Sequence, residues 1–345
     1  MPHHLTDRPR TPGLFSRQAH VLTLCALAIF TCGCPSLNEL PGQSPVQEVK
    51  AEETGAPFLL YVPSTYSSLK AWPLVVLCHG TIPYDTPQLQ MREWASFAET
   101  KGIIVAAPHL AATKGDFPPP PDRQIALQKQ DEQTILKLVS TLKGRYKIAE
   151  DQVFLTGWSA GAYDILYAGL RHPEIFRALA IRQGSFDKRF MEIPADRFDR
   201  WQPIKVIYGS TDFIRDQTKD CVQWLRDQKL FVEELELPGT HRRIDPKFVW
   251  EFCSKITRER PWIRLTARAV DPAQPLAVQF SLDTVPPATR QRWDFGDKSE
   301  ESRDASPVHT YAKPGRYEVT VGVTLKGGKK FNRKRAIQVG VPREN

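Results

Sequence analysis

Gly157-Trp158-Ser159-Ala160-Gly161 lies between an apolar run, Val153–Thr156, and a helical pattern, Ala160–Arg171. The apolar run predicts a buried strand, and the two glycines let the chain turn sharply from strand to helix without a side-chain clash. Such a turn leaves the hydroxyl of Ser159 projecting above the edge of a sheet. A serine hydroxyl is a weak nucleophile unless a neighbouring base accepts its proton. Ser159 therefore requires a histidine and a carboxylate from elsewhere in the chain.

Short apolar runs alternate with longer helical patterns on both sides of this turn. The alternation of strands and helices predicts a mainly parallel sheet covered by helices on both faces, which is an α/β fold. Ile135, Leu138, Val139 and Leu142 have the spacing of one helix face. The predicted strands are Phe58–Val62, Leu74–Cys78, Ile103–Ala107, Val153–Thr156, Ala178–Arg182, Ile204–Tyr208 and Phe231–Leu237.

Two later loops carry candidates for the carboxylate and the base. Asp212 follows the predicted strand Ile204–Tyr208, and His241 follows the predicted strand Phe231–Leu237. The carboxyl ends of parallel strands meet at one edge of a sheet, so these loops bring both residues towards Ser159. The order serine, acid, histidine is the one expected when the nucleophile lies on a strand-to-helix turn.

Other acidic and histidine residues compete for these positions. Asp187 follows the preceding strand and stays open as an alternative acid. His109 and His172 occupy positions typical of structural or pocket-wall residues, and each lies next to a proline.

Acyl transfer also needs hydrogen-bond donors for the oxyanion of its tetrahedral intermediate. One candidate is the backbone N–H of Ala160, directly after Ser159. The other is the N–H of Thr81, because His79-Gly80-Thr81 follows a predicted strand and Gly80 lets the backbone approach closely. His79, Gly80, Gly157 and Gly161 are predicted to support the oxyanion loop and the serine turn. The sequence has no metal-ligand spacing, and we expect neither a metal nor a cofactor.

After Trp262 the pattern changes to two-residue alternation with turns and no helix, which predicts an antiparallel β-sandwich. Trp293-Asp294-Phe295-Gly296-Asp297, followed by His309, Tyr311, Pro314-Gly315 and Tyr317, resembles the polycystic-kidney-disease (PKD) module over residues 263–341. The resemblance implies a non-catalytic accessory domain of the kind appended to secreted hydrolases, in which His309 is structural. It does not name a ligand.

Charge divides at the same boundary. Residues 262–345 carry 15 Lys or Arg and 9 Asp or Glu, whereas residues 35–261 carry 29 of each. The excess indicates either contact with an anionic polymer or lipid head group, or a solvated edge strand that resists aggregation, and we favour the second. Only one aromatic residue, Phe331, interleaves with these charges, so nucleic acid is not an expected partner. The basic residues flank a predicted hairpin at Gly327-Gly328 and are Lys326, Lys329, Lys330, Arg333, Lys334 and Arg335.

An N-terminal signal peptide is predicted for residues 1–34. The apolar run Val21–Thr31 follows three arginines and is too short to span a membrane. It ends at Gly33-Cys34, which resembles a bacterial lipobox, so we expect lipidation of Cys34 and anchoring to a membrane on the extracytoplasmic side. Plain secretion stays open as the alternative. Residues 35–56 then form a proline-rich linker.

Three cysteines follow the predicted leader. Cys78 lies in an apolar strand pattern and is expected to be a buried thiol. Cys221 and Cys253 lie on two predicted helices and are able to pair in an oxidising compartment.

Five stretches between Tyr61 and about Trp250 carry a family resemblance: Leu77–Gly80, Leu155–Gly161, His172–Phe176, Tyr208–Asp212 and Gly239–His241. In these stretches the chain resembles the secreted poly(3-hydroxybutyrate) depolymerase and feruloyl esterase group of α/β-hydrolases. The resemblance implies an α/β-hydrolase domain at residues 57–261, ahead of the PKD-like sandwich at residues 262–345. It also implies hydrolysis of carboxylic esters, in a polyester or linked to carbohydrate, without a cofactor. A serine peptidase of the same fold and a catalytically idle binding lipoprotein remain alternatives.

Overall fold

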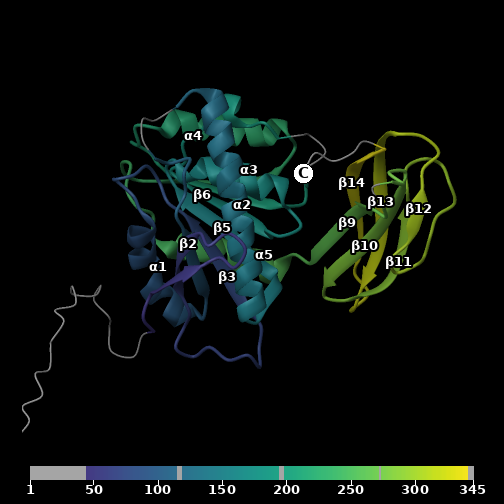
Figure 1. The fold of residues 1–345 in the computed structure, drawn as a ribbon, viewed down its shortest axis with the longest axis horizontal. Helices are drawn as coiled ribbons and strands as arrows, with labels where there is room; N and C mark the ends of the chain where they lie inside the picture. Colours follow the sequence, from purple (N-terminus) through teal and green to yellow (C-terminus); the bar gives the residue numbers. More distant parts are fainter. Residues whose placement is uncertain (1–43, 115–118, 194–197, 272, 341–345) are drawn as a thin grey trace, which may run out of the picture. The chain divides into compact units, whose positions relative to one another are not determined.

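The computed structural model describes residues 44–114, 119–193, 198–271 and 273–340 (Figure 1). An eight-stranded sheet has the strand order β1-β2-β4-β3-β5-β6-β7-β8. Neighbouring strands are parallel from β4 to β8, and antiparallel where β1 meets β2 and β2 meets β4. The predicted parallel sheet is confirmed. Its strands are β1 (Gln47–Lys50), β2 (Pro57–Tyr61), β3 (Trp72–Cys78), β4 (Ile104–Pro108), β5 (Ile148–Trp158), β6 (Ala178–Arg182), β7 (Pro203–Gly209) and β8 (Phe231–Leu237).

Helices cover both faces of this sheet, as predicted. Leu138 of α2, Leu166 of α3 and Leu225 of α4 lie in the core on one face, whereas Trp94 of α1 and Phe252 of α5 lie in the core on the other. The helices are α1 (Pro87–Lys101), α2 (Pro121–Arg145), α3 (Gly161–Arg171), α4 (Arg215–Asp227) and α5 (Pro246–Glu259), with a short 3₁₀-helix η1 (Lys188–Phe190).

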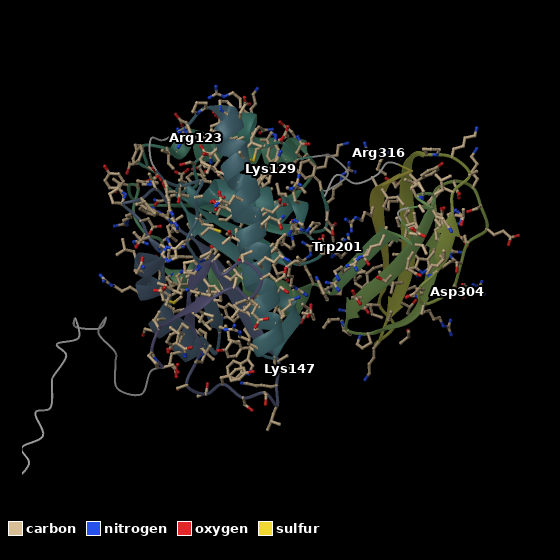
Figure 2. All side chains as sticks on the ribbon, viewed as in Figure 1. Arg123, Lys129, Lys147, Trp201, Asp304 and Arg316 are labelled. Carbon is tan, nitrogen blue, oxygen red and sulfur yellow. The ribbon has the colours of Figure 1, made fainter. Side chains whose placement is uncertain are left out.

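The helix α2 shows why this pattern forms a helix here. Its apolar positions Ile135, Leu138 and Leu142 are buried against the sheet. Charged side chains on its outer face, among them Arg123 and Lys129, are exposed (Figure 2), whereas Asp131 and Glu132 are buried. A helix with one apolar and one charged face gains most of its stability from packing the apolar face.

Two expectations are corrected by the fold. The predicted linker, residues 35–56, is too long: residues 47–50 form β1, which pairs with β2, and Ala51 is buried. A strand can pair through its backbone with an open sheet edge without being apolar, so the hydrophobic pattern of the sequence did not predict β1. Cys221 and Cys253 are free, buried thiols, because α4 and α5 pack on opposite faces of the sheet.

The C-terminal part is an antiparallel sandwich of two three-stranded sheets, β12-β10-β9 and β11-β13-β14. Trp293, Phe280 and Val321 are buried between the sheets. His309 stacks on Phe295, with ring centroids 4.1 Å apart. The predicted β-sandwich is therefore confirmed. Its strands are β9 (Trp262–Ala269), β10 (Ala277–Val285), β11 (Ala288–Asp294), β12 (Val308–Thr310), β13 (Gly315–Leu325) and β14 (Lys330–Val339).

The predicted hairpin joins β13 to β14, but its basic residues are not uniformly solvated. Arg333 is buried and its Nε donates to the carbonyl of Ile263 at 3.1 Å. Arg335 donates to the carbonyl of Leu265 at 2.7 Å. These two arginines join β14 to β9 across the sandwich and belong to its structure, so the basic surface is smaller than the sequence indicated.

The predicted signal peptide and Cys34 lie outside the described residues, so the lipobox stays a prediction. In residues 44–340, apart from the short gaps given above, no helix combines the length and apolarity needed to cross a bilayer.

Candidate active site

Ser159 lies at the sharp turn between β5 and α3. Its φ of 54° falls in the left-handed region, which a residue with a side chain adopts only when its surroundings hold it there. Its N–H donates to the carbonyl of Arg182 at 3.0 Å. A Cβ on Gly157 or Gly161 would come within 2.4 or 2.5 Å of the Cys78 carbonyl oxygen. Only glycine fits on either side of the turn, which accounts for the spacing of the motif.

His241 and Asp212 meet Ser159 at this turn. Asp212 follows β7 and His241 follows β8, so the strand order brings both loops to one edge of the sheet. Nε2 of His241 lies 3.0 Å from Ser159 Oγ, and Nδ1 lies 3.0 Å from both Asp212 oxygens. The buried Asp212 also accepts the N–H of Ile214 at 2.9 Å. With Nδ1–H donating to the carboxylate, the Nε2 lone pair faces the serine hydroxyl.

Two aromatic side chains that the sequence analysis did not assign enclose the imidazole of His241. The ring centroids of Trp158 and Phe213 each lie 4.7 Å from its centroid. Trp158 is fixed because its Nε1 donates to Gln183 at 3.0 Å, and Gln183 donates to the carbonyl of Thr240 at 2.6 Å. Phe213 is 81% exposed, so it presents an apolar ring to solvent beside His241.

The loop after β3 passes directly beside the nucleophile. A Cβ added to Gly80 would lie 3.2 Å from Ser159 Cβ. The Gly80 carbonyl accepts a hydrogen bond from His79 Nδ1 at 2.9 Å. A trans peptide holds its C=O and N–H in opposite directions, so the N–H of Thr81 points away from the His79 ring. Among the backbone hydrogen bonds of the described residues outside the helices and strands, none has the N–H of Thr81 or of Ala160 as its donor.

His79 supports this loop as a neutral imidazole. Its side chain is fully buried, and Nε2 accepts the N–H of Leu110 at 3.0 Å. Nδ1 also lies 3.2 Å from Thr113 Oγ1. Burial lowers the pKa of His79 to about 4, because the charged form would lose its hydration. The ring therefore stays uncharged near neutral pH and contributes hydrogen bonds rather than proton transfer.

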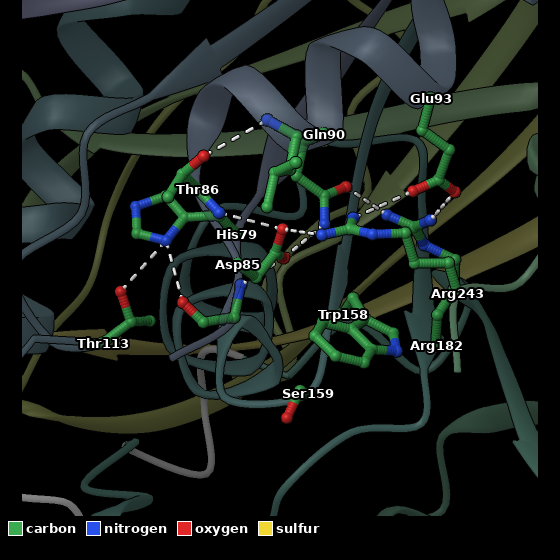
Figure 3. A network of polar contacts seen from close by, with 12 residues as sticks. His79, Asp85, Thr86, Gln90, Glu93, Thr113, Trp158, Ser159, Arg182 and Arg243 are labelled. Atoms are coloured by element: carbon green, nitrogen blue, oxygen red, sulfur yellow. Dashed lines mark hydrogen bonds and ion pairs between the residues drawn. The ribbon is translucent and has the colours of Figure 1, made fainter. Parts of the chain in front are cut away.

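A buried polar network that the sequence analysis missed lies behind this loop (Figure 3). Arg182, which ends β6, donates to Glu93 at 2.5 Å and to Gln90 at 2.6 Å. Arg243 contacts Glu93 at 3.2 Å and also contacts Asp85. Gln90 donates to Asp85 at 2.5 Å. In the sequence, the one signal for this network was that Arg182 ends an apolar run. A buried strand that ends in arginine needs carboxylate or amide partners for the guanidinium.

The other acidic and histidine residues considered from the sequence make contacts away from Ser159. Asp187 caps the helix η1, accepts the N–H of Arg189 at 2.9 Å and pairs with its guanidinium. His172 lies 2.8 Å from Glu132, and His309 belongs to the sandwich. Among the residues that the structure describes, no group of three or more histidine, cysteine or acidic side chains is arranged to hold a metal ion.

Four consecutive prolines, at positions 118–121, predict a stiff wall or lid beside the site in the segment Ala111–Arg123, which the structure describes only in part. Residues 115–118 lie outside the described ranges. The N–H groups of Ala111 and Ala112 donate to the Asp131 carboxylate at 2.8 and 2.7 Å. The start of the segment is therefore fixed to α2, and its role as a wall stays a prediction.

Two protein-family models match the chain. The prolyl oligopeptidase family model matches residues 92–206, which include Ser159 and end before Asp212 and His241. The PKD domain model matches residues 258–340. Each match covers less than half of the chain. Together with the strand order, they confirm the predicted α/β-hydrolase and PKD-like parts.

Individual proteins are similar to parts of the chain. Human polycystin-1 is 43% identical over 68 residues, which are 18% of this chain and 2% of polycystin-1. The substrate-free ferulic acid esterase AmCE1/Fae1A of Anaeromyces mucronatus is 18% identical with a TM-score of 0.48, over 62% of this chain and 91% of that chain. Dipeptidyl peptidase 4 of Porphyromonas gingivalis is 14% identical with a TM-score of 0.47, over 62% of this chain and 35% of that chain.

Proposed function

We propose that this protein is a serine hydrolase that cleaves carboxylic esters through an acyl-enzyme, without a cofactor. One observation carries the proposal: the His241 imidazole lies at hydrogen-bond distance from both partners, with Nε2 3.0 Å from Ser159 Oγ and Nδ1 3.0 Å from the Asp212 carboxylate. The chain has an α/β-hydrolase fold, and these side chains lie at the carboxyl ends of its parallel strands. Reacting groups of this fold assemble at that edge.

Acylation begins when Ser159 Oγ attacks the ester carbonyl and His241 Nε2 accepts the hydroxyl proton. Asp212 holds the imidazole in the tautomer that can accept this proton, and it stabilises the resulting imidazolium. The N–H groups of Ala160 and Thr81 donate to the oxyanion. The C–O bond of the ester then breaks, and the alcohol leaves with the proton from His241.

Deacylation repeats these steps with water as the nucleophile. His241 accepts a proton from the water, whose oxygen attacks the acyl carbon, and the same N–H groups stabilise the second oxyanion. Collapse of this intermediate releases the carboxylic acid and returns the proton to Ser159 Oγ. The enzyme is thereby restored.

The ester assignment is supported by the motif resemblance and by the exposed Phe213 ring beside His241. An exposed apolar ring next to the nucleophile offers a packing surface for an acyl group or a polymer end. The match to the prolyl oligopeptidase family favours a serine peptidase as the second candidate. In that case Ser159 performs the same chemistry and an amine leaves instead of an alcohol. A catalytically idle binding protein does not need the hydrogen bonds that join Ser159, His241 and Asp212, which argues against that alternative.

We further propose that the protein acts outside the cytoplasm, anchored to a membrane by lipid on Cys34. The leader pattern of residues 1–34 supports this location. The PKD-like module serves as an accessory domain.

A fluorophosphonate probe tests the proposed function directly. We expect the wild-type protein to be labelled at Ser159 and to hydrolyse 4-nitrophenyl acetate, and the Ser159→Ala variant to do neither while keeping its circular dichroism spectrum. Rates on esters of increasing acyl length, feruloyl esters and peptide amides then separate esterase from peptidase. Equal turnover by Ser159→Ala would contradict the assignment of the nucleophile.

A further inference from the structure

A buried carboxylate holds the loop that carries Thr81. Asp85 Oδ2 accepts the N–H of Gly80 at 2.7 Å, and Oδ1 accepts the N–H of Thr86 at 2.9 Å. The Gly80 carbonyl is held at the same time by His79. The peptide planes on both sides of the Gly80 Cα are thus fixed. Rotating the plane that carries the Thr81 N–H would break a buried hydrogen bond.

Arg243 joins the same carboxylate to the loop that carries His241. It follows His241 by two residues, and its guanidinium contacts both Asp85 and Glu93 (Figure 3). The guanidinium carbon also lies 5.3 Å from the centroid of the Trp158 ring, which packs against the His241 ring. The contact between Asp85 and Arg243 therefore connects the loop after β3 to the loop after β8.

Arg182 and Glu93 complete a network of two guanidinium groups and two carboxylates. The side chains of Arg182 and Asp85 are 0% exposed, that of Glu93 is 11% exposed and that of Arg243 is 30% exposed. The formal charges balance. A buried ion pair resists rearrangement, because separating its partners leaves a charge without compensation. The network thus holds both loops with one set of contacts, beside the serine turn and without bonding to Ser159 Oγ or to the His241 ring.

We propose that Asp85 and Arg243 are positioning residues that keep the N–H of Thr81 at a fixed place relative to Ser159 and His241. This inference rests on the proposed function, in which that N–H binds the oxyanion. Such a donor acts only when it lies within hydrogen-bond reach of a position that the oxygen occupies in the transition state. Loosening the two loops therefore weakens transition-state binding more than substrate binding.

Asp85→Asn and Arg243→Gln test the inference with 4-nitrophenyl acetate as substrate. We expect kcat to fall about 10- to 100-fold in each variant, while KM changes less than about twofold. The inhibition constant of a trifluoromethyl ketone, which mimics the tetrahedral intermediate, should rise in proportion to the loss of kcat/KM. The double variant should lose little more than the worse single variant, because both substitutions break the same contact.

Arg243→Lys keeps a positive charge but not the planar reach to two carboxylates, so it should recover part of the lost kcat. Asp151→Asn is the matched control. Asp151 lies 3.5 Å from the buried Arg177, near the start of β5 and away from Ser159, so its loss should lower thermal stability and leave kcat unchanged.

The outcomes separate this inference from the proposed function. Folded Asp85→Asn and Arg243→Gln proteins with wild-type kcat, or with a raised KM and an unchanged kcat, would overturn the positioning role alone. An inhibition constant that stays constant while kcat falls would overturn it as well. A wild-type protein that does not turn over the ester, or an equally active Ser159→Ala variant, would overturn the proposed function together with the inference.

Discussion

A single imidazole links three distant parts of the chain in the candidate site. His241 contacts Asp212 through Nδ1 and Ser159 through Nε2, and Trp158 and Phe213 pack against its ring. Asp212 is buried and accepts the N–H of Ile214, so its oxygens cannot turn away from the imidazole. The carboxylate therefore sets which nitrogen of His241 carries the proton.

The first prediction follows from this tautomer. Asp212→Asn replaces one oxygen by an NH₂ group, which favours the tautomer with the proton on Nε2. That nitrogen then cannot accept the serine proton. We expect kcat on 4-nitrophenyl acetate to fall by about four orders of magnitude, with the fold retained. Asp187→Asn, at the alternative acid, should leave kcat unchanged. A large loss in Asp187→Asn and a small one in Asp212→Asn would show that the acid is misassigned.

At the scale of single elements, the serine turn depends on the close approach of β5 and α3 to the end of β3. The glycines at positions 157 and 161 face the Cys78 carbonyl, so the backbones meet with no space for a side chain. Gly144, near the end of α2, has open space around its Cα. The two kinds of glycine provide a matched pair for substitution.

The second prediction compares Gly157→Ala with Gly144→Ala. The new methyl group at position 157 would overlap the Cys78 carbonyl, so we expect a loss of about 1–3 kcal/mol in the free energy of unfolding and loss of activity. Alanine at position 144 should raise the free energy of unfolding by about 0.5–1 kcal/mol, because it favours the helix. Urea unfolding of both variants checks this. Equal stability of the two variants would contradict the packing described here.

The helices α2 and α3 bring two carboxyl groups together in the core. Asp131 of α2 holds the N–H groups of Ala111 and Ala112, and Asp164 of α3 is buried beside it. In the described residues no other donor reaches the Asp164 oxygens. Burial, together with the neighbouring Asp131 charge, raises the pKa of Asp164 well above its ordinary value. Both effects therefore favour the neutral form of the Asp164 carboxyl in the folded chain.

The third prediction is the pH dependence that follows. The pKa of Asp164 is higher in the folded chain than its ordinary value of 3.8, so its contribution to stability is complete below that pH. The contribution is lost as pH rises through the folded pKa, by up to about 1.4 kcal/mol per pH unit. Asp164→Asn keeps a neutral donor that does not titrate. We expect the stability of the wild-type protein relative to this variant to decrease from pH 5 to pH 9 in urea unfolding. A constant difference would contradict the raised pKa of Asp164. Asp216→Asn, at an exposed carboxylate, is the control.

Across the whole molecule, the candidate site and the excess of basic residues lie in different parts of the chain. The candidate site lies in residues 35–261, whose formal charges balance, whereas the basic excess lies in residues 262–345. Within the sandwich, Arg333 and Arg335 donate to backbone carbonyls of β9. Part of the basic excess therefore stabilises the sandwich and is not available to an anionic partner.

The fourth prediction concerns location. Lipid on Cys34 would hold the protein firmly at a membrane, because each buried methylene contributes about 0.8 kcal/mol. We expect the wild-type protein to require detergent for extraction and the N-terminal peptide to carry acyl mass. Cys34→Ser should lose the acyl mass and the membrane pool while its turnover of 4-nitrophenyl acetate stays the same. A wild-type protein that is wholly soluble outside the cell and unmodified at Cys34 would favour plain secretion.

Much of the candidate site was accessible from the sequence because its parts are encoded locally. The serine turn needs small residues beside Ser159, and the loops of Asp212 and His241 each follow an apolar strand. The structure brings these three residues together as the strand order predicted. Strand β1 escaped prediction, because pairing at a sheet edge requires backbone groups rather than a hydrophobic pattern.

Local sequence patterns account for the two folded parts, the serine turn and the order of the loops that meet there, since periodicity and turn chemistry act over a few residues. The contact of Asp85 with Arg243, across 158 residues, and the separation of Cys221 from Cys253 by the sheet arise from long-range packing. Polar residues such as Asp85 and Arg182 follow no period. Their partners depend on how the loops of different strands pack at one edge, which no local pattern encodes.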